Sequence, residues 1–235
     1  MQSTIHSIEE LIPHILYEDE DLLVLHKIAG IAVQSKDVFQ KDLNTLLLNY
    51  LPTHYLGIVQ RLDQPVEGIL VFGKTKKATA KLHDQMKQKD IVKRYQAVVL
   101  PAKNAPELFP GEEEEHELRD FLLKAPGQNH SSVVDANVPG AKESYLAYKT
   151  IATLETPQGK ISLLSIHLGT GRHHQIRVQL SHVGLPILGD FKYGVKSENG
   201  LGLCATSLEF THPRTGKLLH FEKEPSGSCF APFYA

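Results

Sequence analysis

Short apolar runs rich in branched and aromatic residues recur along most of this 235-residue chain, and turn residues separate them. Such runs are typical of β-strands, whereas few segments carry the apolar spacing of a helix. Many strands and few helices indicate an α+β fold, a mixed, largely antiparallel sheet with flanking helices. We expect strands within residues 15–33, 69–72, 95–100, 145–151, 161–167, 203–210 and 217–221, and helices over 41–50, 76–89 and from 172–174 onward.

The composition is that of a globular chain with a substantial core. Hydrophobic residues make up 41% of the sequence, enough for one large domain or two small ones. No run of eighteen apolar residues occurs, and residues 1–10 lack the basic and apolar regions of a signal peptide. We therefore expect a cytoplasmic protein with no membrane partner. Residues 1–12 are interpreted as an N-terminal tail, and residues 101–139 as a strand-rich peripheral segment.

Charge is distributed unevenly along the chain. The formal net charge is -2, which argues against a strongly basic nucleic-acid-binding protein. However, the first 23 residues carry six acidic and no basic side chains, whereas residues 61–95 carry nine basic and four acidic ones. A basic segment of this kind could bind a phosphate backbone with moderate, salt-sensitive affinity. The alternative is that the lysines of residues 74–89 are only the solvent-exposed face of a helix.

A carboxylate lies where the chain is predicted to reverse direction, at residue 63. Apolar Ile58-Val59 leads into Arg61-Leu62-Asp63, and Gln64-Pro65 follows. Because proline fixes its own φ and favours an extended residue before it, we expect Asp63 at the end of a strand, just before a turn. A carboxylate there is held by rigid neighbours and can still face a cleft. Taken alone, an aspartate before Gln-Pro would more often be a turn former.

Glycines and positive charges surround a second predicted turn, more than a hundred residues further along the chain. An amphipathic helix is expected to begin near residues 172–174, with Ile176, Leu180 and Val183 on one face. A glycine and then a proline follow, as expected just beyond a helix end. The helix therefore carries Arg177 in its first turns.

The two turn segments together resemble the signature of the RluA-type family of RNA pseudouridine synthases. Gln60-Arg61-Leu62-Asp63 is similar to the family's His-Arg-Leu-Asp element, with glutamine in place of histidine. Gly171-Arg172-His173-His174-Gln175-Ile176-Arg177 is similar to its Gly-Arg-x-His-Gln-Ile/Leu-Arg element. A second departure is Glu67, which adds a negative charge near a loop that would meet RNA. Further similarity lies in residues 15–30, 93–98 and 184–194, so the resemblance covers roughly residues 13–222.

This resemblance implies an enzyme that isomerises specific uridines of ribosomal or transfer RNA to pseudouridine, with RNA as its partner. It also implies a sheet-based catalytic domain, here residues 13–235, made of two halves with the active cleft between them. Many members carry a further RNA-binding domain of the S4 type, and we expect none here. The reaction breaks and remakes a bond between uracil and ribose, which requires neither a metal nor another cofactor. We expect a monomer.

The resemblance assigns three catalytic residues. Asp63 matches the family's essential carboxylate, which acts either as a nucleophile at C1′ of the ribose or as a base at C2′. Arg177 matches an arginine that pairs with this aspartate and orients it. Tyr95 matches a tyrosine whose ring can stack on uracil and whose hydroxyl can serve proton transfer at C5. From the residues alone, Arg177 could instead be a surface arginine of a helix, and Tyr95 a core residue.

Four further residues are candidates for RNA binding. Arg61 matches an arginine that can enter the RNA helix where the uridine was, although it could equally be a structural or phosphate-contacting cation. Arg172, His174 and Gln175 lie at a helix start, where exposed amides and basic side chains would suit a phosphate. The adjacent histidines do not indicate a metal site, because neighbouring residues of a helix point to different faces.

Two other functions fit part of the same pattern. A non-catalytic RNA-binding or RNA-folding protein could use this scaffold, but Asp63, Tyr95 and Arg177 argue against it. A nucleoside or glycoside hydrolase could use Asp63 as its nucleophile. Such enzymes generally need a second carboxylate, and only Glu67 is near in the sequence.

Overall fold

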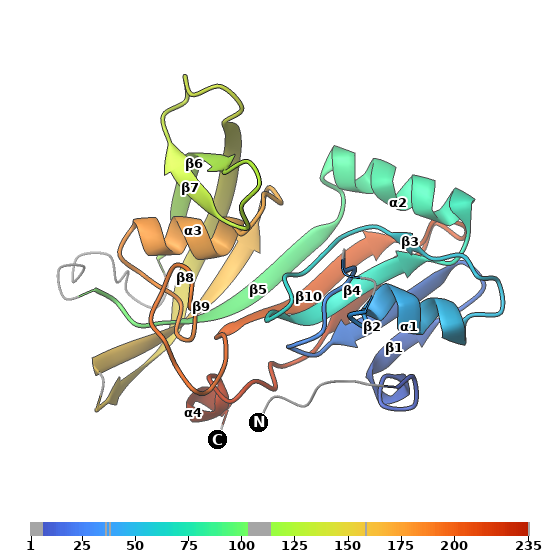
Figure 1. Cartoon of the computed structure of the whole chain (residues 1–235), viewed down its shortest axis with the longest axis horizontal. Helices are drawn as coiled ribbons and strands as arrows, with labels where there is room; N and C mark the ends of the chain where they lie inside the picture. Colours follow the sequence, from blue (N-terminus) through green and yellow to red (C-terminus); the bar gives the residue numbers. More distant parts are fainter. Residues whose placement is uncertain (1–6, 36, 38, 103–113, 158, 235) are drawn as a thin grey trace. The chain divides into compact units, whose positions relative to one another are not determined.

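The computed structural model describes residues 7–35, 37, 39–102, 114–157 and 159–234. The chain forms two compact units (Figure 1). The first contains Met1–Lys93 and Ala205–Pro225, and the second contains Arg94–Cys204 and Ser226–Ala235. The chain therefore leaves the first unit after residue 93 and returns to it at residue 205.

A β-sheet forms the centre of the first unit. Its strands are β1 (Ile15–Glu18), β2 (Leu22–Lys27), β3 (Gly57–Ile58), β4 (Glu67–Gly73), β10 (Leu203–Thr211) and β11 (Leu218–Glu222). They follow the order β1-β2-β4-β10, with β3 on β4 and β11 on β10. β2 and β4 are antiparallel, and every residue of both is buried. Because both of their faces are covered, they read in the sequence as continuous apolar runs and not as alternating ones.

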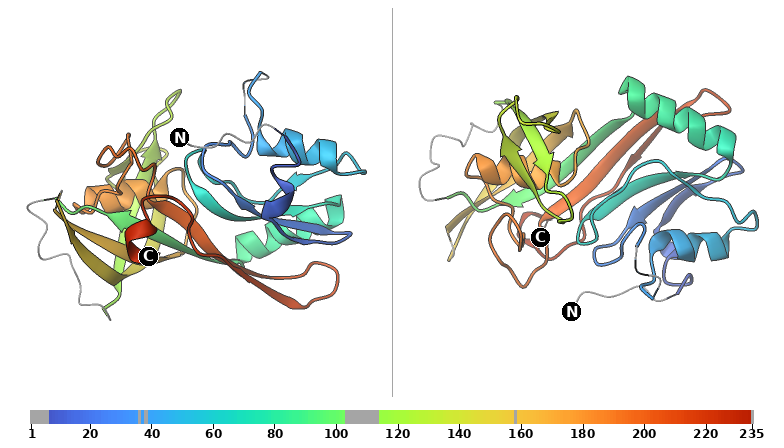
Figure 2. Two further views of the ribbon diagram at one scale, coloured as in Figure 1. Left: turned by 90° about the horizontal axis from the view of Figure 1, so that it is seen from below. Right: turned by 45° about the horizontal axis from the view of Figure 1, so that its top comes forward.

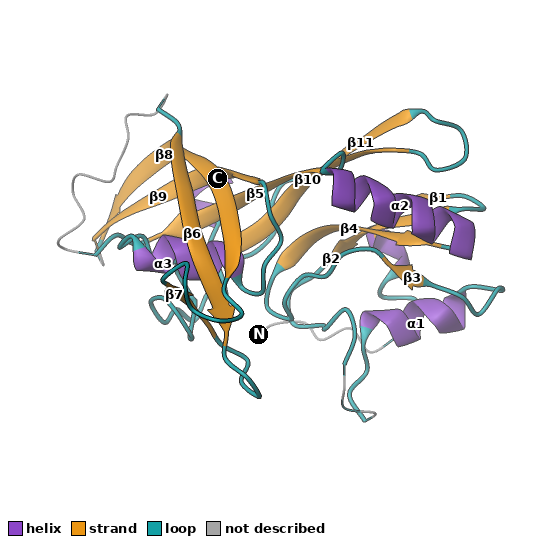
Figure 3. Ribbon diagram, turned by 90° about the horizontal axis from the view of Figure 1, so that it is seen from above, coloured by secondary structure: helices purple, strands orange, loops and turns teal. Residues whose placement is uncertain are grey.

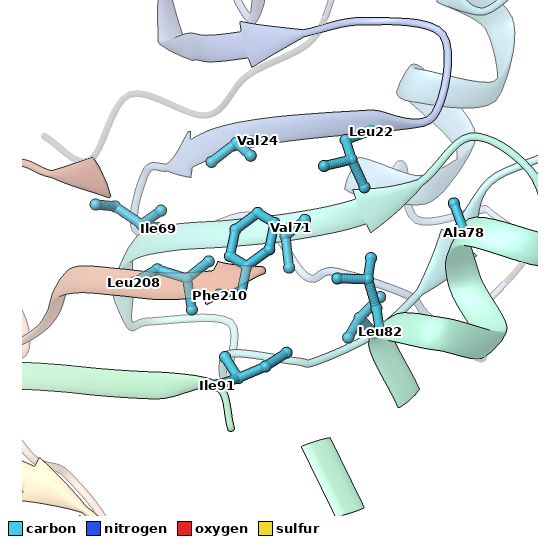
Figure 4. Packing of buried hydrophobic residues seen from close by; sticks show 10 residues of the cluster. Leu22, Val24, Ile69, Val71, Ala78, Leu82, Ile91, Leu208 and Phe210 are labelled. Carbon is cyan, nitrogen blue, oxygen red and sulfur yellow. The ribbon is translucent and has the colours of Figure 1, made fainter. Parts of the chain in front are cut away.

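α2 (Lys76–Gln88) covers one face of this sheet. It begins after Thr75, whose side chain accepts a hydrogen bond from the Ala78 amide, and ends at Lys89 in the left-handed conformation. Ala78 and Leu82 pack into a buried apolar cluster with the strands (Figure 4). The cluster comprises Leu22, Val24, Val59, Ile69, Val71, Ala78, Leu82, Ile91, Leu208 and Phe210.

α1 (Leu43–Tyr50) lies on the other side of β2 and β4 from α2 (Figures 1 and 3). Asp42 caps this helix, because its carboxylate accepts hydrogen bonds from the Thr45 amide at 2.8 Å and the Ser35 amide at 2.6 Å. The β10–β11 hairpin, red in Figure 2, completes the unit and turns around residues 212–216.

An antiparallel sheet also forms the centre of the second unit. Its strands are β5 (Val92–Val99), β6 (His116–Lys124), β7 (Ser131–Val134), β8 (Lys142–Thr156) and β9 (Gly159–Leu168). They follow the order β5-β9-β8-β6-β7, and all four neighbouring pairs are antiparallel. β8 and β9 form a long hairpin that re-enters the sheet at Gly159, where a φ of 124° favours glycine.

Two helices cover this second sheet. α4 (Ala231–Tyr234) follows Phe230, which packs against Val98 and Leu163 on one face of the sheet. α3 (Gln175–His182) contacts β6 and β7 (Figure 2). After α3, Gly184 adopts a φ of 80°, and the Leu185 amide donates to the Leu180 carbonyl at 2.8 Å. The helix end predicted from glycine and proline is therefore confirmed.

The fold class expected from the sequence is confirmed, and each expected strand and helix has its counterpart. The packed chain begins earlier than expected, because Leu11 is fully buried before a short 3₁₀ helix at Ile12–His14. Residues 1–6 of the expected tail lie outside the described residues. The expected strand-rich segment at 101–139 contains β6 and β7, while its residues 103–113 are not among those described. Within the described ranges, no helix is long and apolar enough to cross a bilayer.

Candidate active site

Asp63 lies in a tight turn between β3 and β4. The Val66 amide donates to the Asp63 carbonyl at 3.0 Å, with Gln64 and Pro65 at the centre of the turn. The turn predicted from Gln-Pro is therefore present. The predicted strand before it is wrong, because β3 ends at Ile58 and an irregular stretch leads to Asp63. The Asp63 side chain is partly exposed.

Hydrogen bonds fix the Asp63 turn to a second loop of the first unit. The Gly30 amide donates to the Gln64 carbonyl at 2.9 Å, and the Gln64 amide side chain donates back to the Gly30 carbonyl at 2.9 Å. Lys27 adds a third contact, from its Nζ to the Gln64 carbonyl at 3.1 Å. The residue directly after Asp63 is thus held by three hydrogen bonds, which makes this turn a rigid support for a carboxylate.

Lys27 is the functional candidate that sequence reasoning missed. Its side chain is fully buried, and its ammonium donates to the carbonyls of Ile28, Ile31 and Gln64 at 3.0, 2.8 and 3.1 Å. Burial lowers the pKa of Lys27 to about 7, while the negative charges of Asp63 and Glu67 act to raise it. The buried cation and the Asp63 carboxylate therefore interact electrostatically. A lysine two residues after a run of four apolar residues, Leu22 to Leu25, was the available signal.

Glu67 is not an exposed charge on the loop. It begins β4, is buried, and its charge acts on Lys27. The expectation of a negative charge near a surface that meets RNA is therefore corrected. Gln60, which replaces the family's histidine, also has a structural contact. Its Nε2 donates to the Ile69 carbonyl of β4 at 3.4 Å.

Arg61 lies two residues before Asp63 and is exposed. It forms no hydrogen bond or ion pair with any other residue that the structure describes. An arginine without such partners carries an uncompensated positive charge beside the carboxylate. It is thereby suited to contact a phosphate or an RNA helix.

Tyr95 lies on β5 and is 8% exposed. Directly paired residues of antiparallel strands place their side chains on the same face of a sheet. Tyr95 pairs with Ile166 of β9, and Ile166 pairs with Tyr148 of β8. These three residues therefore share one face of the second sheet, opposite the face formed by Val98.

α3 covers the same face of the second sheet as Tyr95. Gln179 of α3 donates to the Asp120 carboxylate of β6 at 2.6 Å. Asp120 pairs with Ser144 of β8, which lies an even number of residues from Tyr148 and so points to the same side. The structure thereby brings the helix of Arg177 and the strand of Tyr95 to one face.

Arg177 forms a buried ion pair with Asp190. Its Nε lies 2.7 Å from Asp190 Oδ2 and its Nη2 lies 2.8 Å from Oδ1, and the two side chains are 5% and 0% exposed. Burial alone would raise the pKa of Asp190, but the hydrogen bonds and charge of Arg177 outweigh burial and lower it. Arg177 is therefore not a surface arginine. Its predicted pairing with Asp63 joins residues of different units and stays a prediction.

The first six residues of α3, Gln175 to Leu180, are all buried, so the exposed polar face expected of an amphipathic helix is absent from this stretch. The polar members of this stretch have partners in the protein: Gln179 bonds to Asp120, Arg177 to Asp190, and Gln175 to the loop before the helix. Polar residues therefore occupy positions that an isolated helix would expose to solvent.

The three substrate-binding candidates at the start of α3 occupy different environments. Arg172 is exposed, and its Nε donates to the Glu143 carbonyl at 2.8 Å. His174 is buried, adopts a φ of 55°, and its Nδ1 lies 2.8 Å from the hydroxyl of Tyr193. Gln175 is buried as well. Its amide bonds to Thr170 Oγ1, the Arg172 amide and the Tyr145 carbonyl at 2.7, 3.0 and 3.0 Å. His174 and Gln175 thus shape the loop that presents Arg172, and their contact with RNA stays a prediction.

One group of side chains in the described residues has the spacing of a metal site, and it lies away from the Asp63 turn along the chain. Asp19, Asp21 and His212 have ligand atoms within 4.8 Å of one another. The same atoms form an ion-pair network: His212 Nε2 lies 2.8 Å from Asp19, and Arg214 Nε lies 2.6 Å from Asp21. These contacts account for the cluster without a metal.

Comparison with known proteins identifies relatives over most of the chain. The sequence model for RNA pseudouridylate synthase matches residues 21–182. The ribosomal large subunit pseudouridine synthase C of Buchnera aphidicola subsp. Schizaphis graminum is 33% identical over 90% of this chain and 67% of its own. The protein of the same name from Buchnera aphidicola subsp. Baizongia pistaciae is 33% identical, over 86% of this chain and 64% of its own. This chain thus spans about two thirds of the length of these relatives.

The fold has a counterpart among solved structures. Human RNA pseudouridylate synthase domain containing 1 superposes with a TM-score of 0.73, covering 95% of this chain and 86% of that one. The sequences are 20% identical, so this likeness concerns the fold alone.

Proposed function

The chain belongs to the RNA pseudouridylate synthase family, and we propose that it converts specific uridines of RNA into pseudouridine. The names of the two Buchnera relatives favour the RNA of the large ribosomal subunit as substrate over transfer RNA. We place this activity in the cytoplasm, carried out by a monomer without a metal or other cofactor.

The proposed reaction conserves all atoms of the nucleotide. The bond between N1 of uracil and C1′ of the ribose breaks, the base turns, and C5 bonds to C1′. The proton on C5 leaves and N1 gains one. Asp63 is the proposed essential carboxylate, acting either as nucleophile at C1′ or as base at C2′. Because the nucleotide must leave the RNA stack for this chemistry, a protein group has to fill or support the gap.

The observation that carries this proposal is the support of the Asp63 turn within a chain of this family. Three hydrogen bonds fix Gln64, the next residue, and the buried Lys27 lies close enough for its charge to interact with Asp63. A carboxylate held in place in this way needs little reorganisation when it reacts. The hydrolase alternative loses support, because the buried Glu67 is poorly placed to serve as a second, solvent-facing carboxylate.

The other proposed roles follow from where the residues lie. Arg61 is exposed beside Asp63 and is proposed to enter the RNA helix where the uridine was. Tyr95 and Arg177 are proposed to complete the catalytic set, Tyr95 by stacking on uracil and Arg177 by orienting Asp63. Arg172 and the exposed lysines of α2 are proposed to contact phosphates.

Pseudouridine maps of cellular RNA test the proposed function. Cells that lack this gene should lose pseudouridine at one or a few uridines, and the wild-type gene should restore them. A gene carrying Asp63→Ala should restore none, whereas one carrying Asp84→Asn should restore all. Asp84 is a suitable control because it is an exposed carboxylate of α2, 62% accessible, in the same unit. Identical maps with and without the gene would support a non-catalytic RNA-binding protein instead.

A further inference from the structure

We propose that Asp190 is a positioning residue for the isomerisation, acting by fixing the guanidinium plane of Arg177. This inference rests on the proposed function and extends it to a residue outside the catalytic set. Asp190 follows α3 in the second unit and is fully buried against Arg177.

The geometry of the ion pair leaves Arg177 little freedom. Nε and Nη2 are both bonded to Asp190, at 2.7 and 2.8 Å, so one edge of the guanidinium matches the carboxylate in a bidentate pair. A bidentate pair fixes the plane of the guanidinium as well as its position. The other edge, with Nη1, therefore points away from Asp190 in a defined direction.

Asp190 is itself held by its own loop. Its Oδ1 accepts hydrogen bonds from the Lys192 amide at 2.9 Å and the Tyr193 amide at 3.2 Å. Before it, Gly189 has a φ of 79°, and a Cβ there would lie 1.6 Å from the Gly200 carbonyl oxygen. The loop is therefore tightly packed, and the carboxylate cannot turn away from Arg177 without losing contacts.

Tyr193 supports the same guanidinium from a second direction. Its ring centre lies 5.3 Å from the Arg177 guanidinium carbon. Its hydroxyl accepts a hydrogen bond from the Ser131 amide of β7 at 2.7 Å and lies 2.8 Å from His174 Nδ1. Arg177 is thus fixed by a carboxylate and an aromatic ring whose positions are set by β7, α3 and the loop after it.

The energetics favour a functional reason for this arrangement. A buried ion pair loses hydration on both sides, and apolar residues of similar volume often give equal or greater stability. Placing Arg177 and Asp190 at 5% and 0% exposure is therefore a costly way to hold α3 in place. The cost is explained if the orientation of Arg177 matters for the reaction, since small misplacements of a catalytic group lower the rate steeply.

Steady-state kinetics with purified full-length protein test the inference. Asp190→Asn retains one oxygen for the Lys192 and Tyr193 amides but places an amide opposite Arg177 Nε. We expect kcat for pseudouridine formation to fall about tenfold or more, while KM for RNA stays within about threefold of the wild type. A purely structural role would lower the fraction of folded enzyme, which thermal unfolding measures separately.

A double variant separates action through Arg177 from a general effect. In an Arg177→Gln background, adding Asp190→Asn should lower kcat no further, because the residue through which it acts is already gone. Asp120→Asn is the matched control, since Asp120 also binds α3, through Gln179, but takes no part in the ion pair between Arg177 and Asp190. It should leave kcat within about twofold of the wild type.

Several results would overturn the inference. One is a kcat of Asp190→Asn within about twofold of the wild type. Another is that Asp190→Asn lowers kcat by the same factor in the Arg177→Gln background as in the wild type. If Asp190→Asn does not fold, Asp190→Glu replaces it, because it keeps the negative charge but shifts the carboxylate relative to Arg177 Nε and Nη2. Unchanged kcat in that variant overturns the inference too. A wild type that forms no pseudouridine contradicts the proposed function and this inference together. A wild-type kcat in the Asp190→Asn variant contradicts this inference alone.

Discussion

At the scale of single residues, the first unit combines a buried cation with a carboxylate on a rigid turn. Lys27 gives all three of its ammonium hydrogens to backbone carbonyls, and one of these belongs to Gln64, next to Asp63. Deep burial destabilises the charged form of this lysine. Its burial close to Asp63 is explained if both the turn and its electrostatic environment depend on Lys27.

The stability of the protein should depend on pH through Lys27. Burial lowers its pKa from 10.5 to about 7 in the folded chain. Between these values the unfolded chain binds more protons than the folded one, so the free energy of unfolding rises with pH, by up to about 1.4 kcal/mol per pH unit. Urea unfolding at about pH 7 and about pH 9.5 should show the wild type gaining stability relative to Lys27→Met. Parallel pH profiles of the two proteins would contradict this.

Arg61 should matter for RNA and little for stability. The side chain is exposed, and no described residue bonds to it. We expect Arg61→Ala to change the free energy of unfolding by less than about 0.5 kcal/mol. The same variant should bind RNA more weakly, with a shallower dependence of the affinity on salt. Filter binding at several salt concentrations measures both quantities, and an unchanged affinity would argue that Arg61 does not face RNA.

At the scale of elements, Gly68 allows β4 and β10 to approach closely. A Cβ at residue 68 would lie 2.4 Å from the Ala205 backbone nitrogen, and its φ is 137°. Gly68→Ala should therefore destabilise the protein by about 3 kcal/mol, through overlap and backbone strain together.

Gly216→Ala is the matched control for this prediction. Gly216 also has a positive φ, of 73°, but a Cβ there would meet nothing within 4 Å. It should cost about 1 kcal/mol, from backbone strain alone. Equal urea midpoints for the two variants would show that the contact between residues 68 and 205 is not tight.

The elements themselves were largely predictable because they depend on local patterns. β4 follows from a continuous apolar run, α2 from the spacing of Ala78, Leu82 and Met86, and the end of α3 from its glycine and proline. The environment of α3 was not predictable. Its polar residues are buried because their partners, Asp120 and the loop around Asp190, come from distant parts of the sequence.

At the scale of the whole molecule, segments nearly two hundred residues apart meet in the first unit. The turn between β1 and β2 contacts the turn between β10 and β11 through Asp19 and His212, at 2.8 Å. Arg214 of the second turn pairs with Glu20 and Asp21 of the first, at 2.6 Å each. These charges give the returning segment a defined place beside the first strands.

Acid should weaken this contact. Burial alone would raise the pKa of Asp19, but hydrogen bonds from Tyr17, two backbone amides and His212 lower it to about 2. Because the folded pKa lies below the unfolded value of 3.8, the contribution of Asp19 is complete above that value and is lost as pH falls through about 2. The wild type should therefore lose stability relative to Asp19→Asn over this range. Circular dichroism during acid unfolding checks this, and parallel curves would contradict it.

In the candidate site too, local sequence patterns predicted some features, whereas contacts between residues distant in the sequence were not predictable. The sequence predicted the turn at Asp63 from its proline, and the start of α3 from the glycines before it. It did not reveal that Lys27 supports the turn, or that Asp190 binds Arg177, because each partner is chosen by the fold. Burial of His174 and Gln175 also depends on loops that local patterns do not describe.

The release of tritium from RNA labelled at C5 of uridine tests the central claim most directly. Bond formation between C5 and C1′ expels the C5 hydrogen into water, so each isomerised uridine releases its label. With a transcript of large-subunit ribosomal RNA, the wild type and Asp84→Asn should release label to the same limited extent. Asp63→Asn should be slower by about 10³-fold or more. Release by Asp63→Asn at the wild-type rate would contradict the assignment of Asp63 as the essential carboxylate.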